Sequence, residues 1–158
     1  MCSSDLAQHP SETEERLMVR LLTFALHAHA ELVFGKGLST GDEPDLWLKD
    51  LSGNIELWLD VGLPDARRLR KACGRARRVV IYSYGGRGAD LWWEQNRNAL
   101  ERLKNLSVYN LPADTTLSLA SLAQRNMQLQ CTIQDGDVWL ADNDDRVELE
   151  IVTLLSRP

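Results

Sequence analysis

The stretch that decides the fold is residues 43–62, EPDLWLKDLSGNIELWLDVG, which has the pattern of two short strands joined by a tight turn. Apolar and polar residues alternate on both sides of Ser52-Gly53, and this period of two is typical of strands with two different faces. A turn closed on Ser52-Gly53 predicts a single pairing register. Its cross-strand pairs are Leu46 with Leu59, Trp47 with Trp58, Leu48 with Leu57, Lys49 with Glu56, and Asp45 with Asp60.

The pairing of Asp45 with Asp60 is the unusual feature of this register, because like charges directly opposite one another destabilise a strand pair. Two carboxylates about 5 Å apart either raise one another's pKa or share a cation. Mg²⁺ fits such a pair, since it takes oxygen ligands and usually only one or two protein carboxylates. Alternatively, both side chains lie in water at frayed strand ends, where salt screens their repulsion. A turn closed on Gly53-Asn54 would instead pair Trp47 with Asp60.

A strongly basic segment follows the predicted hairpin. From Asp65 to about Ala76 apolar residues recur at helical spacing, which predicts a helix. Seven of the twelve residues from Arg67 to Arg78 are Arg or Lys, and none is acidic. Such a run is either a solvated helix face or a surface that contacts phosphates. The candidate phosphate ligands are Arg67, Arg68, Lys71 and Arg75.

The remaining pattern predicts an α/β (α+β) fold. Ser11 is a good N-cap for a helix that runs to about Ala30, and the nearly continuous apolar run 78–84 indicates a buried parallel strand. His29 falls within the apolar stripe of that first helix, which favours a core histidine. The other expected elements are strands at 32–34 and 106–111, helices at 89–105 and 114–124, and an antiparallel meander at 127–133, 138–141 and 147–152. Together they predict a mixed sheet flanked by helices, followed by a C-terminal antiparallel meander.

Length and composition indicate one ordinary globular domain over residues 1–158. The hydrophobic content of 44% is that of an ordinary soluble protein. The net charge of -5 does not favour nucleic-acid binding, so the basic segment is the one feature of the charge distribution that does. The three cysteines are far apart in sequence, which argues against a zinc site or a disulfide framework and favours a reducing compartment. No signal peptide or membrane span is recognisable. We therefore expect a soluble, cytoplasmic monomer without a membrane partner.

Several short blocks along the chain resemble the YaeQ family of small bacterial proteins. The blocks are His9-Pro10-Ser11-Glu12-Thr13, Glu15-Arg16, Asp42-Glu43-Pro44, Gly62-Leu63-Pro64-Asp65, Lys71-Ala72-Cys73, Asn105-Leu106-Ser107-Val108 and Thr132-Ile133-Gln134-Asp135-Gly136. The resemblance implies a restriction-endonuclease-like core of the PD-(D/E)xK type. It also implies a further N-terminal segment that this chain lacks, since only the nine residues Met1 to His9 come before the first block.

The resemblance also assigns candidate roles to individual residues. Asp45 and Asp60 stand at the two acidic positions of the nuclease motif, and Glu15 is the candidate for a third acidic ligand from the first helix. These residues would surround Mg²⁺, or Mn²⁺ in its place. The Lys of the motif falls at Gly62, so Lys71 or Arg68 is the candidate electrophile.

Three functions follow as hypotheses. The first is a metal-dependent nuclease acting on phosphodiesters, in which the metal polarises a phosphoryl oxygen and activates water. The second is a non-catalytic nucleic-acid-binding or transcription-associated module on the same fold, which Gly62 favours. The third is a protein-interaction domain whose basic helix is only a solvated face.

Overall fold

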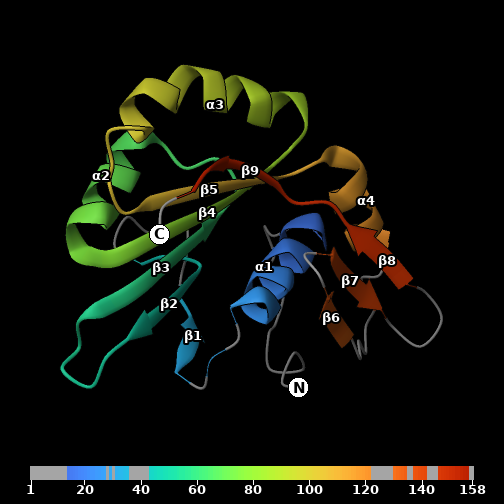
Figure 1. Cartoon of the computed structure of the whole chain (residues 1–158), viewed down its shortest axis with the longest axis horizontal. Helices are drawn as coiled ribbons and strands as arrows, with labels where there is room; N and C mark the ends of the chain where they lie inside the picture. The colour runs from blue at the N-terminus through green and yellow to red at the C-terminus, as the bar shows by residue number, and fades with distance from the viewer. Residues whose placement is uncertain are drawn as a thin grey trace.

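The computed structural model describes residues 14–27, 29, 31–35, 43–121, 130–134, 137–141 and 146–156. Its elements are α1 (Glu14–Leu26), β1 (Leu32–Phe34), β2 (Leu46–Lys49), β3 (Ile55–Val61), α2 (Ala66–Arg75), β4 (Ala76–Tyr84), α3 (Arg87–Leu100), β5 (Leu106–Leu111), α4 (Ala113–Ser121), β6 (Gln130–Gln134), β7 (Asp137–Ala141), β8 (Arg146–Leu149) and β9 (Val152–Leu155). The strands form a six-stranded mixed sheet in the order β1-β2-β3-β4-β5-β9 and a three-stranded antiparallel sheet β6-β7-β8 (Figure 1). The predicted α+β class, with a mixed sheet and an antiparallel meander, is confirmed.

The hairpin of β2 and β3 has the predicted register over most of its length. Leu46, Trp47 and Leu48 pair with Leu59, Trp58 and Leu57. The predicted pairing of Lys49 with Glu56 is wrong, because the register shifts after Leu48 and Lys49 pairs with Ile55. The cause is a wider turn in which the Asp50 carboxylate accepts hydrogen bonds from the backbone N–H groups of Ser52 and Asn54.

The segment after the hairpin forms two parallel crossovers through helices. β4 pairs in parallel with both β3 and β5, as its apolar run predicted. Asp65 caps α2, accepting a hydrogen bond of 2.7 Å from the Arg68 backbone N–H. Because β3, β4 and β5 are parallel, their carboxyl ends and the loops leading into α2, α3 and α4 lie at one edge of the sheet (Figure 1).

The structure differs from the sequence prediction at several element ends, among them that of α3, which ends at Leu100 and not at Asn105. α1 ends at Leu26, so His29 lies beyond the helix and is exposed, and the prediction that it is a core histidine is wrong. The strand predicted at 147–152 is divided into β8 and β9. β9 leaves the meander and pairs antiparallel with β5 at the edge of the six-stranded sheet. The predicted N-cap Ser11 lies outside the described residues.

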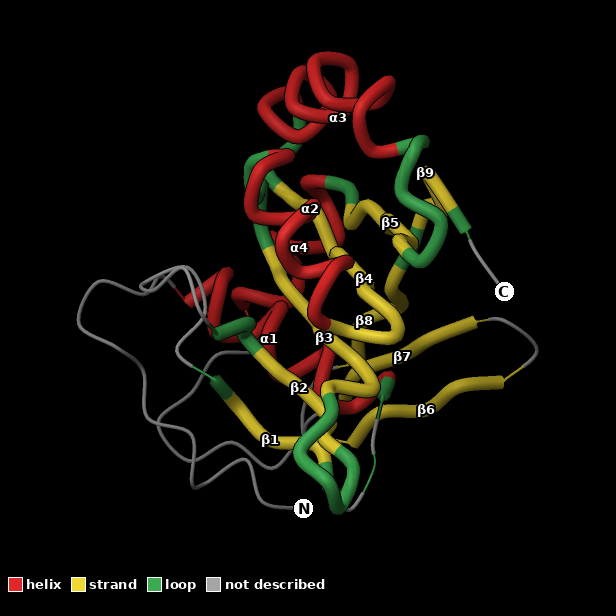
Figure 2. Tube along the Cα trace, turned by 90° about the vertical axis from the view of Figure 1, so that its left-hand side faces the viewer, coloured by secondary structure: helices red, strands yellow, loops and turns green. Residues whose placement is uncertain are grey.

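Two apolar layers lie on opposite faces of the six-stranded sheet. One contains Met18 and Leu22 of α1, Leu119 of α4 and residues of β7 and β8. The other contains Leu69 and Ala72 of α2 and Trp92 of α3. The turn between β2 and β3 projects at the end of the molecule opposite α3 (Figure 2). No helix among the described residues is long and apolar enough to span a membrane.

Candidate functional site

Asp45 and Asp60 lie next to each other at the carboxyl end of β3, as the hairpin register predicted. Asp60 is near the end of β3, and Asp45 comes directly before β2. The backbone N–H of Asp45 donates a hydrogen bond of 3.2 Å to Asp60 Oδ1. Both residues are buried, with 1% and 0% of their surfaces exposed. They are therefore not acids at frayed, solvated strand ends.

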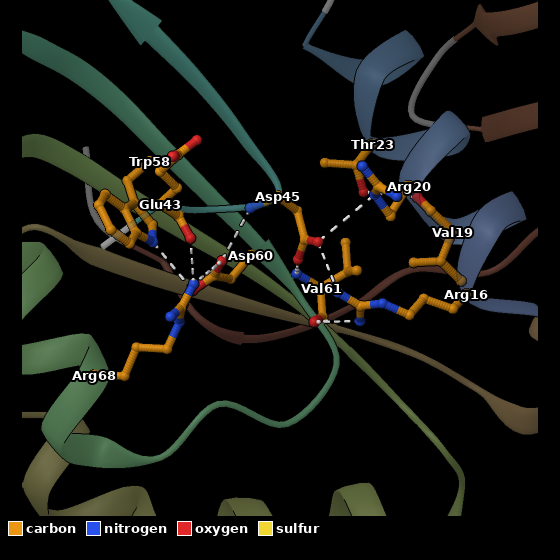
Figure 3. Close-up of polar contacts among 10 residues, drawn as sticks. All are labelled: Arg16, Val19, Arg20, Thr23, Glu43, Asp45, Trp58, Asp60, Val61 and Arg68. Carbon is orange, nitrogen blue, oxygen red and sulfur yellow. Dashed lines mark hydrogen bonds and ion pairs between the residues drawn. The ribbon is translucent and has the colours of Figure 1, made fainter. Parts of the chain in front are cut away.

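The Asp60 carboxylate points toward α2 and forms a two-point ion pair with Arg68. Arg68 Nε donates to Asp60 Oδ2 at 2.9 Å, and Arg68 Nη2 donates to Oδ1 at 3.2 Å. The indole N–H of Trp58 donates to Oδ2 at 3.0 Å. Arg68 Nη2 also donates to the backbone carbonyl of Glu43 at 2.7 Å (Figure 3). Every oxygen of the Asp60 carboxylate thus accepts hydrogen bonds from protein donors.

The Asp45 carboxylate points the other way, toward α1. Arg16 Nη2 donates to Asp45 Oδ1 at 2.7 Å, and Arg20 Nε lies 3.6 Å from the same oxygen (Figure 3). Asp45 Oδ2 accepts the backbone N–H of Val61 at 2.9 Å. Burial raises the pKa of the Asp45 carboxyl, and Arg16 opposes that shift. The two aspartates are neighbours in the backbone, but their carboxylates are paired with arginines on opposite sides of the hairpin.

Glu15 lies on the α1 side of this arrangement. Glu15 is partly exposed. The pKa of the Tyr84 hydroxyl is raised mainly by the burial of Tyr84, and the charge of Glu15 adds to this shift. A hydrogen bond from the Arg16 side chain to Tyr84 opposes that shift. The structure thus places Glu15 beside Tyr84, whose pKa the charge of Asp45 also raises. Within the described residues no group of three or more His, Cys, Asp or Glu side chains is placed to hold a metal ion.

Gly62, where the resemblance to the nuclease motif leads us to expect Lys, has a backbone conformation that favours glycine. Its φ is +100°, in the region that favours glycine, and its N–H donates to the Tyr82 carbonyl at 2.9 Å. The chain turns here from β3 toward α2. Of the two candidate electrophiles, Arg68 reaches Asp60, whereas Lys71 is an exposed residue of α2.

The candidate phosphate ligands all lie on α2. Arg67, Lys71 and Arg75 are exposed, and Arg68 is partly buried by its ion pair. Exposed cations also include Arg70 on α2 and Arg77 and Arg78 at the start of β4. Arg77 forms an exposed ion pair with Glu56 at 3.4 Å.

Sequence reasoning missed Arg16 and Arg20, the partners of Asp45. Their spacing of four residues places both on one side of α1, next to the apolar stripe that packs on the sheet. Two arginines in that position are a signal of a buried anion. This signal could have been recognised in the sequence, but nothing in the local pattern indicates which acidic residue Arg16 and Arg20 pair with.

A family model described as YaeQ protein matches residues 2–151. The chain belongs to the YaeQ family. It is 43% identical over 149 residues to the uncharacterised protein YaeQ of Escherichia coli K12, covering 94% of this chain and 82% of that one. The uncharacterised YaeQ of Salmonella typhi is 44% identical over 146 residues, which cover 92% of this chain and 81% of the relative.

Solved YaeQ structures have the same fold. The YaeQ protein from Xanthomonas axonopodis pv. citri superposes with a TM-score of 0.91 at 48% identity, covering 97% of this chain and 86% of the other. The YaeQ protein from Pseudomonas syringae gives a TM-score of 0.90 at 36% identity, covering 96% and 84%. The resemblance drawn from the sequence blocks is therefore confirmed.

Proposed function

We propose that this YaeQ-family chain is a non-catalytic nucleic-acid-binding module that holds the phosphate backbone on α2 and the start of β4. The observation that carries the proposal is the set of exposed cations on this surface: Arg67, Arg70, Lys71, Arg75 and Arg77. The chain as a whole carries a net charge of -5, whereas residues 67–78 contain seven basic residues and no acidic one. Cations grouped in this way bind nucleic acid by displacing the counterions condensed on its phosphates.

The buried aspartates support binding without cleavage. Mg²⁺ usually retains several water molecules, which need space beside its carboxylate ligands. The side chains of Asp45 and Asp60 are 2% and 0% exposed, and each is paired with an arginine. An ion entering here would displace Arg16 or Arg68, and leaving either arginine unpaired would cost several kcal/mol.

A second candidate is a Mg²⁺-dependent nuclease in which Glu15, Asp45 and Asp60 hold the metal, or Mn²⁺ in its place. Lys71 or Arg68 would then be the electrophile. The observation in its favour is that Asp45 and Asp60 are adjacent at the carboxyl end of β3, beside the cations of α2. This function requires both carboxylates to exchange their arginines for the ion.

The test measures binding and cleavage of labelled single- and double-stranded DNA and RNA over a salt series, with Mg²⁺, Mn²⁺ or EDTA. The proposal predicts salt-sensitive binding without cleavage. Replacing Arg67, Arg70 and Lys71 together with Gln should weaken binding and reduce the slope of log K against log salt by about 0.7–0.9 for each phosphate that the variant no longer neutralises. Arg102→Gln is the matched control, because Arg102 is exposed but lies beyond α3.

Two outcomes would contradict the proposal. Metal-dependent cleavage that is abolished by Asp60→Asn would establish the nuclease instead. Absence of salt-sensitive binding to any of the four nucleic acids would leave the basic surface as a solvated face and favour the protein-interaction domain.

A further inference from the structure

Trp47 lies on a part of the sheet that α2 does not cover. It is on β2, on the same face as Trp58, and is half-buried. Val33, its cross-strand partner on β1, is 50% exposed. Both side chains project on the α2 side, so this edge of the sheet presents an aromatic ring to solvent beside the basic helix.

The indole of Trp47 differs from those of two other tryptophans in the same apolar layer. Trp58 and Trp92 are 1% and 7% exposed. Their N–H groups donate to Asp60 at 3.0 Å and to the Pro64 carbonyl at 2.7 Å. Trp47 donates no hydrogen bond within the part of the chain that the structure describes. A half-buried indole with a free donor is suited to contact a ligand.

One cation lies over this ring. The Lys49 ammonium lies 3.8 Å from the centroid of the Trp47 ring, and Lys49 is exposed. Because a solvated, flexible side chain reaches the ring face, that face is accessible from water. Trp47 and Trp58 meet edge to face, with centroids 6.2 Å apart and planes at 88°.

A row of cations on α2 runs along the same surface. Arg68, Lys71 and Arg75 recur at spacings of three and four residues, so they share one side of the helix. That side faces Trp58, the neighbour of Trp47, since the guanidinium groups of Arg68 and Arg75 lie 5.6 and 5.4 Å from the Trp58 ring centroid. An aromatic ring beside a row of cations is the combination that proteins use to bind single-stranded nucleic acid.

We infer that Trp47 stacks on a base of single-stranded nucleic acid whose phosphates lie along Lys71 and Arg75. This inference rests on the proposed function and adds the strand form and the base-contacting residue. A duplex cannot use the ring in this way, because its bases are stacked on one another and paired. Lys49 is exposed, so it can leave the ring face and contact a phosphate when a base stacks on the ring.

The experiment compares two fluorescein-labelled probes by anisotropy: a short oligodeoxythymidylate and an oligonucleotide of the same length with abasic sites. The chain should bind the probe with bases about 5- to 150-fold more tightly, which corresponds to one stacked base. Trp47→Leu should lose that preference while it still binds the abasic probe as tightly as the wild type. Trp47→Phe keeps an aromatic ring and should retain most of the preference.

Trp93→Leu is the matched control, because Trp93 is also a half-buried tryptophan of the same apolar layer, but lies on α3. It should keep the preference for bases. Thermal unfolding checks that each variant is folded, and the comparison of the two probes on the wild-type chain needs no variant.

The outcomes separate the inference from the proposed function. Equal, salt-sensitive binding of both probes by the wild type would overturn base stacking and leave phosphate binding intact. A base preference that survives Trp47→Leu would overturn the assignment to Trp47. No salt-sensitive binding of either probe, or of a duplex, would overturn both.

Discussion

Arg68 connects three segments of the chain through one guanidinium group. It extends from α2 to the Asp60 carboxylate on β3 and to the Glu43 carbonyl ahead of β2. Asp60 is fully buried, so its negative charge has no water to stabilise it. The Arg68 guanidinium therefore compensates the charge of this buried carboxylate.

Replacing Arg68 should destabilise the protein strongly. Arg68→Met leaves the Asp60 charge buried and unpaired, and we expect the free energy of unfolding to fall by about 3–5 kcal/mol. Urea unfolding measures the change. Arg67→Met is the control, since Arg67 is exposed and should change stability by less than about 0.5 kcal/mol.

The double variant Asp60→Asn, Arg68→Met tests the physical reason. Removing both charges should recover part of the stability lost in Arg68→Met, because no unpaired ion is left in the core. If the double variant is less stable than Arg68→Met, the buried charge is not the cause of the loss.

His27 is the second residue whose burial has a measurable consequence. Its Nε2 lies 2.7 Å from the Tyr82 hydroxyl oxygen at the end of α1. Burial, and to a lesser degree the charge of Arg78, lowers the pKa of His27 to about 4. The unfolded chain has a histidine pKa of about 6.5, so between these values the unfolded state binds more protons than the folded state.

Stability should therefore fall as the pH is lowered from about 6.5 to about 4, and His27 should contribute up to about 3 kcal/mol of that loss. His27→Gln keeps a hydrogen-bonding side chain without the titration, so urea unfolding of this variant should depend less on pH in that window. His29→Gln is the control, because His29 is exposed. An unchanged pH profile in His27→Gln would contradict the assignment.

At the scale of elements, the turn from β3 to α2 decides what position 62 can hold. The positive φ of Gly62 lets the chain leave β3 and begin α2, with Asp65 as its cap. A lysine here would adopt a backbone conformation that side chains rarely take. The path of this connection therefore favours glycine over lysine at position 62.

Gly62→Lys introduces the Lys that the resemblance to the nuclease motif leads us to expect, and it should not produce nuclease activity. We expect the free energy of unfolding to fall by about 1–3 kcal/mol from backbone strain, with no gain of Mg²⁺-dependent cleavage. Gly74→Ala is the control, since Gly74 is an exposed glycine inside α2 with open space at its Cβ position, and it should stabilise by about 0.4–1 kcal/mol. Urea unfolding and a nuclease assay measure the two effects, and cleavage by Gly62→Lys would support the nuclease.

At the scale of the whole molecule, β9 joins the two sheets into one structure. The chain passes from β8 in the antiparallel sheet directly to β9, which pairs with β5 in the six-stranded sheet. Leu154 and Leu155 pack against the apolar layer beneath α2 and α3. β9 also covers the edge of β5, which would otherwise expose unpaired backbone groups.

A chain shortened to end at Ile151 should be less stable by roughly 2–4 kcal/mol, the value expected for partial burial of two leucines. Hydrogen exchange should become faster at Val108 and Asn110 of β5, which face β9, and should remain slow in the centre of β4. Thr153→Ala is the control, because Thr153 is exposed. Slow exchange in β5 of the shortened chain would show that β9 does not protect this edge.

The sequence alone determined the elements and much of their pairing. The alternation of residues 43–62 predicted the Trp47–Trp58 register, and the apolar run of β4 predicted a parallel strand between two helices. These features follow from local periodicity, because the repeat of a strand or helix decides which side chains share a face. The pairing of Lys49 failed because the Asp50 side chain bonds locally to the backbone and widens the turn.

Only the tertiary structure decided what the two aspartates do. The register placed Asp45 and Asp60 side by side, but their partners are Arg16, 29 residues from Asp45, and Arg68, eight residues from Asp60. The energy of a buried charge depends on every hydrogen-bond donor that folding brings near it, and the local sequence pattern does not predict which donors these are. The same holds for β9, whose place at the edge of β5 depends on where the meander ends in space. The sequence thus determined where the acidic pair lies, and the three-dimensional packing of α1 and α2 supplied the arginines that pair with it.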